Sequence, residues 1–346
     1  MEAACINYKE TGFFSHTVTD YLEDKPELRS FYGQRPDMEG FAALLKSKKV
    51  TGNRDTLAKV LTSQYQAIAQ LSTHHSQQVQ DNISLLKSDS TYTITTGHQL
   101  NIFAGPLYFI YKIVTVIKLS RQLKEKFPDK NFVPVYWMAS EDHDFAEINY
   151  TNIGGKKVHW WYEASGATGR INPDTMRQAL NQYKGVLGLD HHANELAEIV
   201  ETAYAKFDKL ADATRYLVNA LFGQYGLVVI DADDHELKKQ FAPIMERDII
   251  EQHSFKNIEA TNKELEKLHV HIQVNPREIN FFYLCDGLRE RIVFEDDVYK
   301  VLNTEISFTK EELQKEIHSS PEHFSPNVVM RPLYQECILP NIAYVG

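Results

Sequence analysis

Residues 91–144 read TYTITTGHQLNIFAGPLYFIYKIVTVIKLSRQLKEKFPDKNFVPVYWMASEDHD, and this stretch decides the fold. The run 91–95 is rich in β-branched and aromatic residues, which predicts a strand. Pro106 suits the first turn of a helix that we expect to continue to about Phe127. The nearly all-apolar run 132–139 is typical of a central parallel strand that is buried on both faces. Strand, helix and strand in this order predict a βαβ unit with a right-handed crossover.

A second unit of the same kind follows later in the chain. Residues 208–225 have leucines at helical spacing and end at Gly226, which is typical of a helix C-terminus. The apolar run 227–230 predicts another short buried strand, and a helix that contains Pro243 follows it. Residues 328–330, Val-Val-Met, are the last candidate core strand. These elements predict an α/β protein with a parallel sheet.

The rest of the chain divides into an N-terminal segment and a core with insertions. Residues 1–90 are expected to be mostly helical and packed on the core, with Asp55 as a candidate helix cap and with His74 and His75 as solvated positions. The core is expected to span 91–346.

Two insertions are expected within this core, at about 154–190 and about 255–305. Short strand-like runs separated by turn residues in 280–303 predict an antiparallel meander inside the second insertion.

Composition excludes several classes of protein. The net charge of −10 argues against sequence-independent nucleic-acid binding, which needs Lys and Arg to neutralise phosphates. The three cysteines lack CxxC spacing, so neither a disulfide framework nor a cysteine-built zinc site is expected. The apolar run 106–119 is too short to span a membrane, and the first residues lack the pattern of a secretory signal. We therefore expect a cytoplasmic protein that acts without a membrane.

Three predicted strands are each followed by polar residues at their carboxyl ends. In open α/β sheets this edge is where ligands bind, so parallel neighbouring strands would bring these side chains to one site. The residues are Thr96, Gly97, His98 and Gln99 after the first strand, Glu141, Asp142, His143 and Asp144 after the second, and Asp231 and Asp233 after the third.

Each group has both a functional and a structural interpretation. The loop after the first strand could bind an anion through backbone amides, although it has neither GxGxxG nor a Walker lysine, or it could be a tight turn with a capping Asn101. The acidic run 140–144 could supply a general base or bind a divalent ion, or it could be a solvated turn that caps the next helix. Arg331 could clamp a carboxylate or phosphate, or pair with Glu336.

Long strings in the chain resemble one family, the cysteine-adding enzymes of bacillithiol biosynthesis. The strings are TTGHQ…FAGPLY…YK from Thr95 to Lys112, PVYWMASEDHDFAEIN from Pro134 to Asn149, VIDADD from Val229 to Asp234, and FSPNVVMRPLYQE from Phe324 to Glu336. The resemblance implies a Rossmann-like core with connecting insertions, similar to class I nucleotidyltransferases. It also implies a ligase that forms an amide between the cysteine carboxyl and the amine of glucosaminyl malate.

The resemblance suggests roles for particular residues. His98 matches the position of a histidine that stabilises phosphate in related nucleotidyltransferases. Together with the strand-end argument, it gives His98, Asp142, His143 and Asp144 as candidate catalytic residues. The candidate substrate- or nucleotide-binding residues are Thr96, Gly97, Gln99, Asn101, Gly105, Lys112, Glu141, Asp231, Asp233, Asn327 and Arg331. No residue is assigned to a metal, and the sequence does not decide whether a divalent metal takes part.

ATP is the expected energy source, because a free carboxylate needs activation before it forms an amide. The lysine-rich second signature of the synthetases is missing, however, so the sequence does not settle ATP use. Cysteine and glucosaminyl malate are the expected small-molecule partners.

Sequences of this family continue past the position of Gly346 into a coiled coil that the resemblance links to dimerisation. We therefore expect a homodimer only where that coiled coil is present, and expect the chain alone to be less stable than an extended one. Two alternatives stay open: an adenylate-forming or nucleotidyl-transfer enzyme that acts on another small acid, and a catalytically incomplete binding subunit.

Overall fold

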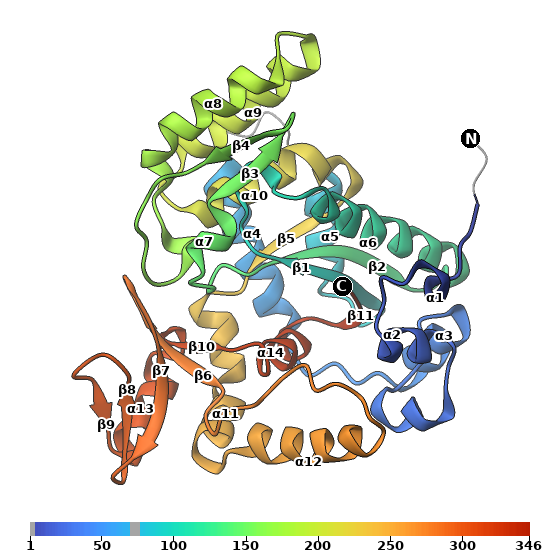
Figure 1. The fold of residues 1–346 in the computed structure, drawn as a ribbon, viewed down its shortest axis with the longest axis vertical. Helices are drawn as coiled ribbons and strands as arrows, with labels where there is room; N and C mark the ends of the chain where they lie inside the picture. The colour runs from blue at the N-terminus through green and yellow to red at the C-terminus, as the bar shows by residue number, and fades with distance from the viewer. Residues whose placement is uncertain (1–3, 70–76) are drawn as a thin grey trace.

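A four-stranded parallel sheet forms the centre of the molecule (Figure 1). The computed structural model describes residues 4–69 and 77–346, so the expectation for His74 and His75 lies outside the described residues. The sheet has the strand order β11-β1-β2-β5. Its strands are β1 (Thr91–His98), β2 (Asn131–Met138), β5 (Val228–Asp231) and β11 (Asn341–Val345).

The predicted βαβ unit is confirmed. β1 pairs with β2 in parallel from Thr91↔Asn131 to His98↔Met138, and α6 (Leu107–Lys126) connects them and packs on both. Pro106 precedes the helix as its N-cap in an extended conformation, one residue earlier than expected. Because β2 is buried on both faces, its nearly continuous apolar sequence is explained.

Helices from both halves of the chain cover the sheet. α4 (Arg54–Ala69), α5 (Gln77–Leu85) and α10 (Leu210–Phe222) all contact β5. The N-cap of α4 is a correction to the prediction. The Asn53 side chain accepts from the Thr56 amide, and Asp55 lies inside the first turn, where a carboxylate still favours the helix dipole. The shorter N-terminal helices are α1 (Tyr8–Thr11), α2 (His16–Leu22) and α3 (Met38–Ser47).

A hairpin and a helix pair form the upper part of Figure 1. After α7 (Phe145–Ile148), β3 (Tyr150–Ile153) and β4 (Lys156–His159) pair antiparallel. Two helices follow in sequence, α8 (Arg177–Leu187) and α9 (His191–Lys206), and they contact each other.

A second, antiparallel sheet of five strands contains the predicted meander, which is confirmed. Its order is β10-β6-β7-β8-β9, with β6 (Phe281–Cys285), β7 (Leu288–Glu295), β8 (Val298–Val301), β9 (Ser307–Phe308) and β10 (Phe324–Pro326). The helices next to it in sequence are α11 (His235–Glu251), α12 (His253–Lys267) and α13 (Lys310–Ser319). In Figure 1 this sheet lies below the carboxyl ends of the central strands, to the left.

The predicted core strand at 328–330 is wrong. These residues form a turn in which the Asn327 side chain accepts from the amides of Val329 and Met330, and Val328 is exposed. An asparagine that bonds the backbone two and three residues ahead favours a turn over a strand. Arg331 therefore begins a helix, α14 (Arg331–Ile338), instead of following a strand.

The fourth strand of the central sheet is β11, from the last apolar stretch of the chain. It pairs in parallel with β1, and both Thr93 and Thr95 donate their hydroxyls to the Asn341 side chain. In the described part of the chain, no helix is long and apolar enough to cross a membrane.

Candidate functional site

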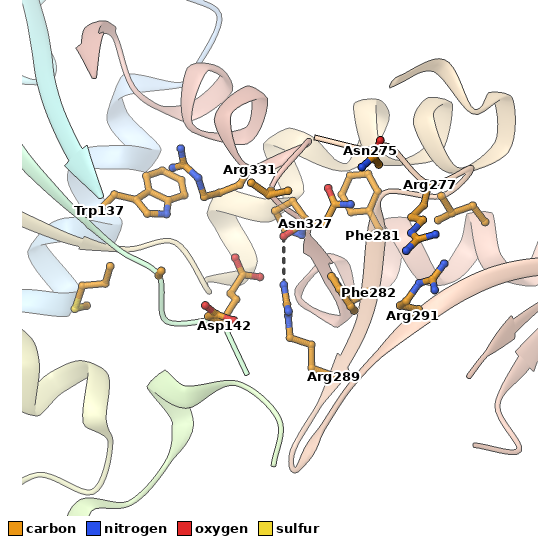
Figure 2. A pocket seen from close by; sticks show the side chains of 16 residues that line it. Trp137, Asp142, Asn275, Arg277, Phe281, Phe282, Arg289, Arg291, Asn327 and Arg331 are labelled. Carbon is orange, nitrogen blue, oxygen red and sulfur yellow. Dashed lines mark hydrogen bonds between the residues drawn. The ribbon is translucent and has the colours of Figure 1, made fainter. Parts of the chain in front are cut away.

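A cavity of about 530 Å³ lies between the carboxyl end of β2 and the antiparallel sheet (Figure 2). We call it the arginine cavity. It lies where open α/β sheets place their ligands, and its volume is in the range of small-molecule sites. Its lining residues are Trp137, Met138, Ala139, Glu141, Asp142, Asn275, Arg277, Ile279, Phe281, Phe282, Arg289, Arg291, Pro326, Asn327, Val328 and Arg331.

Four arginines line this cavity, and in the described part of the chain none of them forms an ion pair with a carboxylate. In Figure 2, Arg277 and Arg291 lie toward one end, Arg331 and Trp137 toward the other, and Arg289 between them. The arginine–carboxylate ion pairs found in the described residues all belong to other arginines, namely Arg29, Arg35, Arg54, Arg170 and Arg215. Uncompensated guanidiniums around a cavity are suited to bind an anion, because their fork of donors matches a carboxylate or phosphate.

Arg289 is held in place by neutral partners. Its guanidinium lies 3.9 Å from the Phe282 ring centroid, and its Nε donates to the Ser325 hydroxyl at 3.1 Å. One of its terminal nitrogens lies 2.7 Å from Nδ1 of His143. Burial lowers the pKa of Arg289, against the nearby charges of Glu141 and Asp142. These contacts fix the direction of the side chain and leave its charge available.

Arg331 is positioned by aromatic rings. Its guanidinium lies 5.7 Å from the Trp137 centroid and 5.2 Å from that of Tyr344, and it donates to the Gln335 side chain at 3.1 Å. The alternative pairing with Glu336 does not occur, because Glu336 forms its ion pair with Lys48. Cation–π contacts hold a guanidinium without cancelling its charge.

Carboxylates occupy the β2 side of the cavity. Asp142 accepts from the Gln99 side chain at 2.7 Å, and the same amide group donates to Glu147 at 2.6 Å. The other Asp142 oxygen accepts from the backbone amide of His143 at 2.8 Å. Asp142 is therefore oriented by neutral donors and forms no ion pair with a described Lys or Arg, which leaves it able to accept from a ligand cation.

A buried ion network lies beneath Asp142. Lys238 has no solvent exposure and contacts Glu141 at 2.6 Å and Asp233 at 3.0 Å. Asp233 also accepts two hydrogen bonds from Arg170, at 2.7 and 3.0 Å. Although burial alone would raise it, Lys238 and Arg170 hold the pKa of Asp233 at about 2. Burial raises the pKa of Glu141, and Lys238 opposes that change.

Asp231, at the end of β5, points into the same buried region. It accepts from the Ser140 hydroxyl and from the Asp233 amide, and burial together with the Asp233 charge raises its pKa. Neither Asp231 nor Asp233 is among the lining residues of the arginine cavity. The hydrogen bonds of Asp231 and Asp233 instead hold the turn after β2 in place.

A second cavity of about 260 Å³ lies at the carboxyl end of β1, and we call it the His98 cavity. It is lined by Gly97, His98, Gln99, Tyr108, Lys112, Trp137, Ala139, Arg331 and Tyr344. Trp137, Ala139 and Arg331 also line the arginine cavity, so the two cavities meet at these residues.

His98 is nine-tenths buried in this cavity, and its hydrogen bonding identifies its tautomer. Nδ1 lies 3.0 Å from the carbonyl oxygen of Gln99, which can only accept, so Nδ1 carries the hydrogen. Nε2 is buried and has no partner among the described residues. Burial lowers the pKa of His98, and the nearby Lys112 charge acts in the same direction. Neutral His98 therefore presents a hydrogen-bond acceptor, whereas a phosphate oxygen would need a donor.

The other predicted site residues have structural partners. Thr96 donates its hydroxyl to the Val345 carbonyl, and the Asn101 amide donates to the Glu147 carbonyl. Gly105, at φ 54°, packs on the Asn101 side chain. Lys112 lines the His98 cavity and donates to the Gly97 carbonyl at 3.1 Å.

The two remaining candidates lie near the site and are exposed. His143 contacts Arg289, and Asp144 is the exposed N-cap of α7 without a side-chain cap bond. Neither is among the lining residues of the two cavities. Among residues 4–69 and 77–346, no group of three or more His, Cys, Asp or Glu side chains could hold a metal ion.

Three of the four cavity arginines were missed from the sequence: Arg277, Arg289 and Arg291. A signal exists for two of them, because Arg289 and Arg291 are two residues apart on β7 and so project from the same face of the strand. That signal does not say which face meets the central sheet.

Comparison with known proteins agrees with the α/β fold and its parallel sheet. The family model described as bacillithiol biosynthesis BshC, N-terminal Rossmann-like domain, matches residues 1–346. A protein from Flavobacterium johnsoniae is 49% identical over 349 residues, which is 100% of this chain and 65% of the relative. A protein from Flavobacterium psychrophilum is 46% identical over 100% of this chain and 65% of the relative. One from Cytophaga hutchinsonii is 42% identical over 99% of this chain and 63% of the relative.

Each of these relatives bears the name "Putative cysteine ligase BshC". The chain thus spans slightly less than two thirds of the length of the relatives that it matches.

Proposed function

Because this chain belongs to the BshC family of bacillithiol biosynthesis, through its Rossmann-like domain, we propose that it carries the site of the cysteine-adding step. In this reaction the carboxyl of cysteine forms an amide with the amine of glucosaminyl malate. The proposed site is the arginine cavity together with the adjoining His98 cavity. The homologues' name supports the class of reaction, a ligase that forms a carbon–nitrogen bond.

The observation that carries the proposal is the charge distribution in the arginine cavity. Glucosaminyl malate has two carboxylates on its malate part and an ammonium on its sugar part. The cavity offers uncompensated guanidiniums from Arg277 and Arg291 toward one end, the guanidinium of Arg289 between the ends, and the carboxylate of Asp142 toward the other end. A substrate with anions at one end and a cation at the other satisfies both sides at once.

In this binding mode of glucosaminyl malate, each group of side chains has its own role. The guanidiniums bind the malate carboxylates and fix the position of the sugar. Asp142 accepts from the sugar ammonium and takes a proton as the amine becomes a nucleophile. Arg331, at the junction of the cavities, faces the negative charge that develops on the cysteine carboxyl oxygen during attack. Gln99 keeps Asp142 in the required orientation through its hydrogen bond.

Activation of the cysteine carboxyl needs an energy source, and we propose ATP. The end of β1 and the loop after it do not form a glycine cradle for phosphates, since a Cβ on Gly97 would meet the Tyr344 hydroxyl and one on Gly105 would meet Asn101. Lys112 and Arg331 in the His98 cavity are the cations that would face a phosphate group attached to the cysteine carboxyl on activation, and this group would leave when the sugar amine attacks.

The proposal includes a compartment and an assembly state. We propose the cytoplasm, which fits the presence of three free cysteines, because cytosolic thiols are kept reduced. Dimerisation would depend on the coiled coil that the family resemblance implies.

The test measures product formation directly. The purified chain is incubated with cysteine, glucosaminyl malate and ATP, and bacillithiol is measured by mass spectrometry. We expect product that depends on cysteine and is reduced at least tenfold by Arg291→Met, while Arg177→Met on the exposed surface of α8 leaves it unchanged. Pyrophosphate release without any dependence on cysteine would instead support a nucleotidyl-transfer enzyme that acts on another acid.

Bacillithiol in cells tests the same proposal without purification. Extracts of a bacillithiol-producing strain that lacks its own gene are compared with and without expression of this chain. Restored bacillithiol supports the proposal. Binding of glucosaminyl malate by the purified chain, with no restored bacillithiol and no product in vitro, would make the chain a binding unit and overturn the proposed activity.

A further inference from the structure

The His98 cavity is separate in composition from the arginine cavity and has its own recognition chemistry. It is about half as large, and its lining includes His98, two cations and three aromatic rings. The rings are those of Tyr108, Trp137 and Tyr344. Its volume is below that of typical drug-sized sites, which favours a ligand of a few heavy atoms.

The acceptor is the Nε2 atom of His98. This atom is buried without a partner, and a buried polar atom of this kind is costly unless a ligand or water completes it. Tyr108 and Phe109 hold the imidazole, with ring centroids at 5.1 and 5.2 Å. With Nδ1 fixed on the Gln99 carbonyl, the ring cannot turn to offer its N–H instead.

The cations are Lys112 and Arg331. Lys112 donates to the Gly97 carbonyl and lies 5.5 Å from the Tyr108 centroid, and it forms no ion pair with any residue that the structure describes. Among residues 4–69 and 77–346, the partners of the Arg331 guanidinium are the Gln335 amide oxygen and the two aromatic rings. An anionic group placed between these two side chains would meet positive charge on both sides.

We propose that the His98 cavity binds an α-amino acid as its zwitterion, with the ammonium donating to Nε2 of His98 and the carboxylate facing Lys112 and Arg331. That the amino acid is cysteine rests on the proposed function. Because Arg331 belongs to both cavities, the carboxylate of the amino acid lies at their junction, where the sugar amine reaches it from the side of Asp142. The aromatic rings suit a thiol side chain, since sulfur packs favourably against them.

The experiment uses ligands that lack one group each. Isothermal titration calorimetry measures the binding of cysteine, of 3-mercaptopropionate, which has no ammonium, and of cysteamine, which has no carboxylate, under reducing conditions. The proteins are the unchanged chain, His98→Ala and the control His159→Ala. His159 also has a buried unpartnered ring nitrogen, but it lies on β4 and lines neither cavity.

For the unchanged chain we expect both analogues to bind at least tenfold more weakly than cysteine, because each loses a hydrogen bond to a charged group. His98→Ala should weaken cysteine by a similar factor and leave 3-mercaptopropionate unchanged, and His159→Ala should change neither. Equal affinity of the unchanged chain for cysteine and 3-mercaptopropionate overturns the proposal, and this comparison stands even if His98→Ala fails to fold.

A parallel assay for the amide product separates the two proposals. If the ligand comparison gives the expected pattern but no bacillithiol forms, the amino acid site stands and the proposed activity fails. If bacillithiol forms but removal of the ammonium has no effect on binding, the activity stands and the assignment of the His98 cavity is wrong.

Discussion

Two groups of cations lie close to the turn after β2, and they differ in what neutralises them. Below the turn, Lys238 and Arg170 each contact carboxylates at 3.0 Å or less. In the arginine cavity above it, Arg277 and Arg291 have no carboxylate partner among the described residues. The first group is complete within the protein, whereas the second becomes complete only when an anion binds.

Burial explains the difference. A fully buried charge is tolerated only with a partner, because its desolvation costs several kcal/mol, and Lys238 has no solvent exposure. Arg277 is exposed and Arg291 is half-buried, so both keep contact with water and can stay unpaired at little cost until a ligand replaces that water. Around this turn, the cations that are paired within the protein therefore stabilise the fold, and the unpaired cations are the candidates for ligand binding.

The largest effect is expected from removal of the central cation of the buried network. Lys238→Met leaves Glu141 and Asp233 buried without their shared partner, which should lower the free energy of unfolding by about 3–5 kcal/mol. Urea denaturation measures it, with Lys239→Met on the exposed face of the same helix as the control. Equal stability of the two variants would contradict the claim that the buried ion network stabilises the fold.

Loss of the cavity cations should act on binding instead of stability. Arg277→Met and Arg291→Met should each weaken glucosaminyl malate binding by about 1.5–3 kcal/mol, the usual loss for a hydrogen bond to a charged group. The free energy of unfolding should change by less than about 0.5 kcal/mol, as for surface substitutions away from special features. Calorimetry and urea denaturation measure the two quantities. A variant that unfolds more easily but binds glucosaminyl malate normally would contradict the claim that these arginines serve ligand binding.

The acid dependence of stability tests the pairing of Asp233. Its pKa of about 2 lies below the ordinary value of 3.8, so its contribution is present above about pH 4 and is lost as the pH falls toward 2. The shift corresponds to about 2 kcal/mol. Glu141 and Asp231 have raised pKa values, so their contributions to the pH dependence of stability have the opposite sign. To isolate Asp233, the free energy of unfolding of the unchanged chain is compared with that of Asp233→Asn between pH 5 and 2. Parallel stability curves for the two proteins would show that Asp233 is not held by its cations.

Added salt should produce the smallest effect, and it should act differently on the cavity arginines and on the buried ion network. Added NaCl screens charges that are open to water and acts far less on buried pairs. Glucosaminyl malate should therefore bind a few-fold more weakly in 0.5 M than in 0.05 M NaCl, while the midpoint of urea unfolding shifts little. Binding that does not respond to salt would argue that the guanidiniums are not the groups that hold the ligand.

The central βαβ unit could be predicted because its local signals agree with its tertiary environment. β2 is apolar throughout and is buried on both faces, and β1 and β2 end together in the register His98↔Met138. This register is why the polar residues after β1 and β2 meet at one edge. His98 and Asp142 nevertheless line adjoining cavities instead of one, because Trp137 and Arg331 lie between the two spaces and line both.

One error has a local cause, and the others have tertiary causes. Residues 328–330 have the composition of a strand, but the Asn327 side chain bonds the following amides and turns the chain. β11 contains Asn341, a poor strand residue, which is accepted because its side chain bonds Thr93 and Thr95 across the sheet. The arginines of β7 lie far along the chain from β2, and only the packing of the second sheet brings them to the site.

The parallel pairing of β11 with β1 has a consequence for the order of events in folding. Thr93 and Asn341 are neighbours in the sheet although they are far apart along the chain. Closing so long a loop costs entropy before any contact repays it, so such pairings form slowly and late. Until then β1 has an unpaired edge, which is a template for association with other chains. Because Tyr344 belongs to β11 and lines the His98 cavity, that cavity can take its final shape only after this last strand has joined the sheet.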